Sequence, residues 1–137
     1  MQLWGDTSPY PGGSILIVDD SGEWRTRVRE ILQTQPDLRI VAEACDGIQA
    51  VHSAVELHPD LVLLDIRMPE LSGFDAAHQI RRFSPGTKIV FLTHEIDADI
   101  QSAALAAGAD GYVLKIDAAR KLLPTIAAAL GNGHQDG

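Results

Sequence analysis

The sequence places reactive side chains where short apolar runs end. These residues are Asp19, Asp20, Asp65, Thr93 and Lys115. Three carboxylates in one pocket repel one another unless a positive charge neutralises them. Carboxylate oxygens are ligands that Mg²⁺ prefers, together with water and the phosphate oxygens of a substrate. Gathered at one place, these side chains predict a site for Mg²⁺ and a phosphoryl group.

Three of these residues have a direct use in phosphoryl chemistry. Aspartate side chains are ionised at neutral pH, so Asp65 can accept the group covalently as a nucleophile. The ammonium of Lys115, on its flexible stem, suits one phosphoryl oxygen, and the Thr93 hydroxyl supplies a donor for another. The chemistry indicated is transfer of a phosphoryl group to an aspartate.

For these groups to meet, the apolar runs must be strands of one sheet. Four of the five runs contain no polar residue, which is typical of parallel strands with helices on both faces. The carboxyl ends of such strands meet at one edge of the sheet, where open α/β proteins bind their ligands. The runs cover residues 15–18, 40–42, 61–64, 89–92 and 112–114.

Apolar residues between the runs recur at helical spacing. Trp24, Val28 and Ile31 form one such stripe beside the acidic pair, and similar stripes follow the other runs. Ser21 suits the start of the first helix, and Gly108 suits the end of the fourth. The prediction is an α/β fold of five β-α units, (βα)₅, with a doubly wound parallel five-stranded sheet and right-handed crossovers.

Composition narrows the class of protein. The 137 residues fit one domain, and the single cysteine, Cys45, excludes a disulfide framework and a cysteine-built zinc site. We expect Cys45 to be a small core residue. No apolar run approaches the roughly 20 residues of a membrane span, so we expect a cytoplasmic protein without a membrane partner. The net charge of −8 disfavours direct binding of nucleic acid by this chain.

The chain divides into three parts by composition. Residues 1–13 hold two prolines and three glycines without a hydrophobic period, so they are predicted to be a flexible leader. Residues 14–131 are predicted to be the folded domain, and residues 132–137 a tail.

The ordered motifs resemble a known family, the receiver domain of response regulators, which is the CheY-like module of two-component signalling. The resemblance covers residues 14–131 and is carried by the stretches 15–20, 63–73, 91–93 and 107–115. The alanine-rich last helix and the stretch 111–115 resemble the NarL/FixJ branch. The resemblance implies the flavodoxin-like strand order 2-1-3-4-5.

The resemblance also implies a role for each acidic residue. Asp65 would take a phosphoryl group from a phosphohistidine on a sensor histidine kinase or a phosphotransfer protein. Asp20, Asp65 and the backbone carbonyl of Arg67 would bind Mg²⁺ directly, and Asp19 would act through a metal-bound water.

A conformational switch is implied as well. Thr93 and Lys115 would hold two phosphoryl oxygens, and movement of Thr93 would let Tyr112 swing from solvent toward the interior. The face made by the fourth helix, the fifth strand and the fifth helix would then be read by a downstream protein or by a C-terminal output domain. The domain would be a regulatory phosphoacceptor and not an enzyme beyond its own phosphotransfer and autodephosphorylation. The alanine-rich last helix also suits a homodimer.

Three positions depart from the usual pattern of the family. His94 stands where relatives usually carry a small residue, and its imidazole would narrow access to the pocket. Ile116 stands where many relatives carry proline. Arg67 puts a further positive charge at the mouth of the pocket, where it would guide a phosphoryl donor or change the lifetime of the acyl phosphate.

Three other functions stay open. A degenerate receiver would act as a phosphorylation-independent interaction domain. A haloacid-dehalogenase-like phosphatase would need a second aspartate at the position of Arg67. A flavodoxin-like carrier of FMN would need a phosphate loop rich in Ser, Thr or Gly where the sequence has Asp19 and Asp20. The intact set of Asp65, Thr93 and Lys115 favours the phosphoacceptor.

Overall fold

Strands and helices alternate along the chain. The structure, a computed structural model, describes residues 12–131. Its strands are β1 (Gly13–Val18), β2 (Leu38–Ala44), β3 (Leu61–Leu64), β4 (Lys88–Thr93) and β5 (Gly111–Leu114). Its helices are α1 (Gly22–Leu32), α2 (Gly47–Leu57), α3 (Gly73–Phe83), α4 (Ala98–Ala106) and α5 (Ala118–Gly131), with the 3₁₀ helix η2 (Lys115–Asp117) before α5. Strand β1 includes Gly13, one residue before the predicted domain boundary at residue 14. Residues 1–11 of the predicted leader and the whole predicted tail lie outside the described residues.

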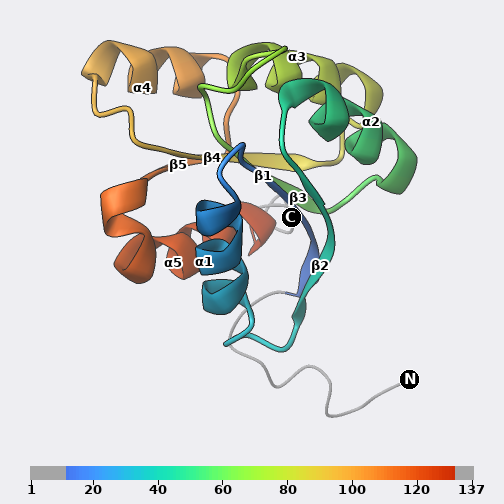
Figure 1. Cartoon of the computed structure of the whole chain (residues 1–137), viewed down its shortest axis with the longest axis vertical. Helices are drawn as coiled ribbons and strands as arrows, with labels where there is room; N and C mark the ends of the chain where they lie inside the picture. The colour runs from blue at the N-terminus through green and yellow to red at the C-terminus, as the bar shows by residue number, and fades with distance from the viewer. Residues whose placement is uncertain (1–11, 132–137) are drawn as a thin grey trace.

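The strands form one parallel sheet in the order β2-β1-β3-β4-β5. Helices α1 and α5 cover one face of this sheet, and α2, α3 and α4 cover the other (Figure 1). The predicted fold class and strand order are therefore confirmed. The strand order reverses between β1 and β3, and open α/β sheets bind ligands in the crevice outside the carboxyl ends at such a point.

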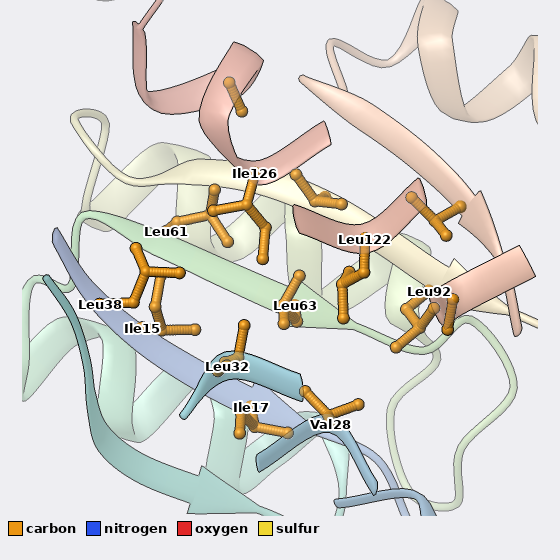
Figure 2. Packing of buried hydrophobic residues seen from close by; sticks show 14 residues of the cluster. Ile15, Ile17, Val28, Leu32, Leu38, Leu61, Leu63, Leu92, Leu122 and Ile126 are labelled. Atoms are coloured by element: carbon orange, nitrogen blue, oxygen red, sulfur yellow. The ribbon is translucent and has the colours of Figure 1, made fainter. Parts of the chain in front are cut away.

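Two buried clusters fill the space between the sheet and its helices. On one face, Ile15 and Leu63 pack with Leu122 of α5 (Figure 2). On the other face, Leu16 belongs to a cluster with Ile80 of α3. Successive side chains of a strand point to opposite faces, so a strand that is covered on both faces needs an apolar residue at every position. This requirement explains the uninterrupted apolar runs of the central strands.

Strand β2 departs from this pattern because it lies at the edge of the sheet. Arg39, Val41 and Glu43 are exposed, although the two end residues of the strand are buried. Cys45, which follows the strand, is exposed. Its predicted place in the core is therefore wrong, because within residues 12–131 no further strand lies beyond β2 to cover it.

The helix ends follow the predicted signals. The hydroxyl oxygen of Ser21 accepts a hydrogen bond of 3.2 Å from the backbone N–H of Trp24 and caps α1. Gly108, with a φ of +97°, lies just beyond α4 in the left-handed region that glycine favours. Among residues 12–131, no helix is long and apolar enough to cross a membrane.

Candidate functional site

Three carboxylates meet at the carboxyl edge of the sheet. Asp19 and Asp20 follow β1, and Asp65 follows the neighbouring strand β3. One oxygen from each carboxylate lies within 4.8 Å of the others. Asp19 and Asp65 are buried, and Asp20 is exposed. Oxygen atoms at this spacing can bind one divalent cation, and the exposed side leaves room for the waters that Mg²⁺ retains. The donor set therefore fits Mg²⁺.

Lys115 supplies a positive charge inside this cluster. Its Nζ lies 2.7 Å from Oδ2 of Asp19 and 3.0 Å from Oδ2 of Asp65, and its side chain is only 3 % exposed. Lys115 is the first residue of η2 and directly follows β5. Its ammonium therefore lies at the same edge of the sheet as the carboxylates. One ammonium nevertheless faces three carboxylates, which leaves the pocket with an excess of negative charge.

The electrostatics of Asp19 reflect this crowding. Burial raises the pKa of the Asp19 carboxyl above its ordinary value of 3.8. Hydrogen bonds from Lys115 and from the backbone N–H of Ser21 act in the opposite direction but do not cancel the effect of burial. The ionised form of Asp19 is therefore held in the fold at an energetic cost.

The hydroxyl of Thr93 lies on another side of the pocket. Thr93 is the last residue of β4 and is buried. Its Oγ1 accepts a hydrogen bond of 3.2 Å from the backbone N–H of Glu95. Asp65, Thr93 and Lys115 line one small pocket of about 280 Å³, as the carboxyl-edge rule predicts.

Arg67 and Glu95 form an ion pair at the mouth of the pocket. Nε of Arg67 donates to Oε2 of Glu95, and the Arg67 side chain is 72 % exposed. This hydrogen bond raises the pKa of the Arg67 guanidinium. Sequence reasoning missed Glu95. The sequence position of Glu95 could have revealed it. Arg67 lies two residues after Asp65, and Glu95 lies two residues after Thr93. Because β3 and β4 are adjacent, the segments that follow them lie at the same edge of the sheet.

Tyr112 lies behind the loop that carries Glu95. Its side chain is half-buried, and its hydroxyl donates a hydrogen bond of 2.9 Å to the backbone carbonyl of Glu95. Its ring lies 6.4 Å from the ring of Phe91, measured between centroids. Glu95 therefore joins three predicted residues, since it contacts Thr93, Tyr112 and Arg67.

An aromatic side chain from α1 also faces the pocket. Trp24 and His94 both line it, and their rings meet edge to face with centroids 5.7 Å apart. His94 is exposed at the mouth, where its imidazole was predicted to narrow access. Ile116, the other departure next to a site residue, is 86 % exposed.

A close backbone contact holds the loop between Asp65 and α3. The N–H of Gly73 donates a hydrogen bond of 2.7 Å to the carbonyl of Ile66. A Cβ atom at position 73 would lie 2.0 Å from the backbone oxygen of Asp65, which no real contact allows. Glycine at this position therefore lets α3 begin directly against the residue that carries the central carboxylate.

Comparison with known proteins agrees with this site. The family described as the response regulator receiver domain matches residues 15–127. The transcriptional regulatory protein LiaR of Bacillus subtilis is 38 % identical over 115 residues, which cover 84 % of this chain and 54 % of LiaR. The response regulator protein VraR of Staphylococcus saprophyticus is 35 % identical over 118 residues, 86 % of this chain and 56 % of VraR. The chain thus spans about half the length of these curated relatives.

Solved structures show the same fold. The response regulator domain of Thermotoga maritima CheB has a TM-score of 0.81 at 32 % identity, over 88 % of this chain and 97 % of that one. A two-component response regulator of the LuxR family from Aurantimonas has a TM-score of 0.84 at 30 % identity, over 88 % of this chain and 86 % of that one. The chain therefore belongs to the response regulator receiver domains of two-component systems, within the NarL/FixJ-like branch.

Proposed function

We propose that Asp65 is the phosphoacceptor of this receiver domain and that it takes a phosphoryl group from a phosphohistidine on a partner protein. The observation that carries the proposal is the buried contact of Asp65 with Lys115 inside a cluster of three carboxylates. A carboxylate held beside a buried ammonium can approach an anionic donor that three unneutralised carboxylates would repel.

The transfer needs positioning more than it needs further chemistry. An oxygen of Asp65 forms a bond to phosphorus as the bond from phosphorus to the histidine nitrogen breaks, and that nitrogen keeps the electron pair. The ammonium of Lys115 and the hydroxyl of Thr93 each donate to a phosphoryl oxygen. The later attack of water on phosphorus releases inorganic phosphate and restores the carboxylate, so the domain catalyses only its own phosphorylation and dephosphorylation.

The acidic residues would hold Mg²⁺ during both steps. Asp20, Asp65 and the backbone carbonyl of Arg67 are the proposed direct ligands, with Asp19 acting through water. When bound, Mg²⁺ neutralises negative charge on the carboxylates and on the phosphoryl oxygens. The exposed side chain of Arg67 points away to Glu95, which is compatible with a role for its carbonyl in the pocket.

The switch would act through Glu95. The Thr93 hydroxyl would move toward Asp65 to donate to a phosphoryl oxygen. This movement would pull on the backbone N–H of Glu95, which donates to the hydroxyl oxygen. The Glu95 carbonyl also accepts from Tyr112, so the loop and the tyrosine would move together. A charge-assisted hydrogen bond is worth about 1.5–3 kcal/mol, enough to shift a two-state equilibrium more than tenfold.

The altered surface would be α4, β5 and α5, and its reader a downstream protein or an output domain. One protein of similar structure is a DNA-binding response regulator of the LuxR family from Staphylococcus aureus, at 26 % identity. We propose by analogy that this receiver controls an output of that kind, with a sensor histidine kinase or phosphotransfer protein as donor. A homodimer through the alanine-rich α5 is part of the same proposal.

The proposal is tested by the mass of the intact protein. The protein is incubated with acetyl phosphate, with Mg²⁺ or with EDTA, and we expect the gain of one phosphoryl group only with Mg²⁺. The variant D65N, which keeps the size of the side chain, should gain none. No gain by the wild-type protein with acetyl phosphate or with a phosphohistidine donor would favour the degenerate receiver instead.

A further inference from the structure

The indole ring of Trp24 faces the ammonium of Lys115. Nζ of Lys115 lies 5.0 Å from the centroid of the ring. The Lys115 side chain is almost completely buried, so the ammonium is shielded from water where it meets the ring. An ammonium over an aromatic face is attracted by the ring quadrupole, and the attraction is largest when the cation is desolvated. The contact is therefore a cation–π interaction of the stronger kind.

Two hydrogen bonds connect the backbone of Trp24 to Asp19 in the pocket. Oδ1 of Asp19 accepts a hydrogen bond of 2.9 Å from the N–H of Ser21. The hydroxyl of Ser21 in turn caps α1 by accepting from the N–H of Trp24 at 3.2 Å. Since Oδ2 of Asp19 pairs with Lys115 at 2.7 Å, the four residues form a closed circuit of contacts. The same aspartate thus holds both the ammonium and the start of the helix that carries the ring.

A second contact orients the ring from the side of β4. His94 meets it edge to face at an interplanar angle of 81°. The guanidinium of Arg27, which is exposed, lies 5.3 Å from the same ring centroid. The Trp24 ring therefore contacts His94 and two cations. Of these cations, Lys115 lines the pocket, whereas Arg27 lies outside it.

We infer that Trp24 is a positioning residue for phosphoryl transfer, because its indole face holds the Lys115 ammonium in the pocket. The inference rests on the proposed function of Asp65. A lysine side chain has four rotatable bonds, and restricting them at the moment of transfer costs conformational entropy. An aromatic face beside Nζ restricts that rotation beforehand, while still letting the ammonium turn from a carboxylate to a phosphoryl oxygen. Preorganised charge of this kind is what electrostatic catalysis requires.

The test compares W24L with W24F. Leucine removes the aromatic face and keeps an apolar side chain, whereas phenylalanine keeps a smaller face. With acetyl phosphate and Mg²⁺, we expect W24L to be phosphorylated about tenfold more slowly than the wild-type protein. We expect W24F to recover most of the rate. R27A, which removes the exposed cation from the same ring, is the matched control and should stay within about twofold of the wild-type rate.

Two measurements separate positioning from a general structural role. In the K115M background, W24L should slow phosphorylation no further, because the ring would have no ammonium to hold. In NMR spectra of the full chain without Mg²⁺, the ε-methylene protons of Lys115 should lie upfield of free lysine, and W24L should abolish this ring-current shift. The wild-type spectrum alone tests the contact even where W24L fails to fold, because unshifted ε-methylene protons would show that the ammonium does not lie over the ring.

The outcomes distinguish this inference from the proposed function. A wild-type protein that is never phosphorylated would overturn the proposed function and the inference together. A wild-type protein that is phosphorylated no faster than W24L would overturn the inference alone. So would an equal effect of W24L with and without Lys115, or unshifted ε-methylene protons in the wild-type spectrum.

Discussion

Nζ of Lys115 lies 3.0 Å from Oδ2 of Asp65, and both side chains are buried although 50 positions separate them in the sequence. Strand β4 lies between β3 and β5 in the sheet, so the lysine stem reaches past the end of β4 to make this contact. The same ammonium also pairs with Asp19. One buried ammonium thus pairs with two buried carboxylates of the pocket.

Replacing this lysine should destabilise the fold in a way that a divalent cation reverses. K115M keeps an unbranched apolar stem but leaves the carboxylates of Asp19 and Asp65 without their ammonium. We expect a loss of about 3 kcal/mol in the free energy of unfolding in EDTA, measured with urea at pH 7. Excess Mg²⁺ should restore a large part of the loss. An unchanged free energy of unfolding in EDTA would show that the ammonium does not neutralise the cluster.

Removing one buried negative charge should have the opposite effect. Burial raises the pKa of Asp19, so the ionised form of this side chain is unfavourable in the folded state. D19N keeps an oxygen that can accept from the N–H of Ser21 and reduces the repulsion within the cluster. We expect D19N to be more stable than the wild-type protein at pH 7 in EDTA, measured by unfolding with urea. A less stable D19N would mean that the ion pair with Lys115 outweighs the cost of burial.

The loop after Asp65 should not tolerate a side chain at position 73. In G73A the new Cβ would lie 2.0 Å from the backbone oxygen of Asp65, so α3 or Asp65 must move. We expect a loss of about 2–3 kcal/mol in stability and much slower phosphorylation. G86A is the matched control, because a Cβ there meets nothing within 4 Å, and it should change stability by less than about 0.5 kcal/mol. Equal stabilities of the two variants would contradict the close contact.

The hydroxyl of Tyr112 should ionise late in an alkaline titration. Burial raises its pKa above the ordinary value of 10.0, and the charges of Glu95 and Asp97 act in the same direction. The difference in tyrosinate absorbance between the wild-type protein and Y112F should therefore have a midpoint above pH 10, and E95Q should lower that midpoint.

The same shift predicts how stability depends on pH. Because the pKa is raised in the folded state, the contribution of Tyr112 is complete below pH 10 and is lost as the pH rises through the folded-state pKa. The wild-type protein should thus lose stability relative to Y112F in that range. A tyrosinate midpoint at or below pH 10 would contradict the half-buried position of the ring.

The central strands could be predicted because a strand that is buried on both faces has an uninterrupted apolar sequence. The run at 61–64 is apolar at every position and forms β3 with those bounds. The edge strand β2 has polar residues among its apolar ones and is therefore harder to delimit from sequence. It spans Leu38–Ala44, whereas the predicted run covers only residues 40–42. Nothing in the residue type of Cys45 reveals that it follows an edge strand, so its exposure could not be foreseen.

The site could be predicted as far as the strand ends determine it. Asp65 and Lys115 meet because parallel strands end at one edge, a rule that needs no side-chain detail. The contacts of Glu95 and the cation–π contact of Trp24 depend on loop and helix placement instead. Trp24 was expected near the acidic pair, but its distance from Lys115 follows from how α1 packs on the sheet, which sequence spacing does not encode.

The most direct test of the central claim identifies the residue that carries the phosphoryl group. The full chain is phosphorylated with Mg²⁺ and acetyl phosphate, reduced with borohydride, digested and sequenced by mass spectrometry. Reduction of an aspartyl phosphate leaves homoserine, and we expect homoserine at position 65 and intact aspartate at positions 19 and 20. Homoserine at position 19 or 20, or at none of the three, would contradict the assignment of Asp65 as the phosphoacceptor.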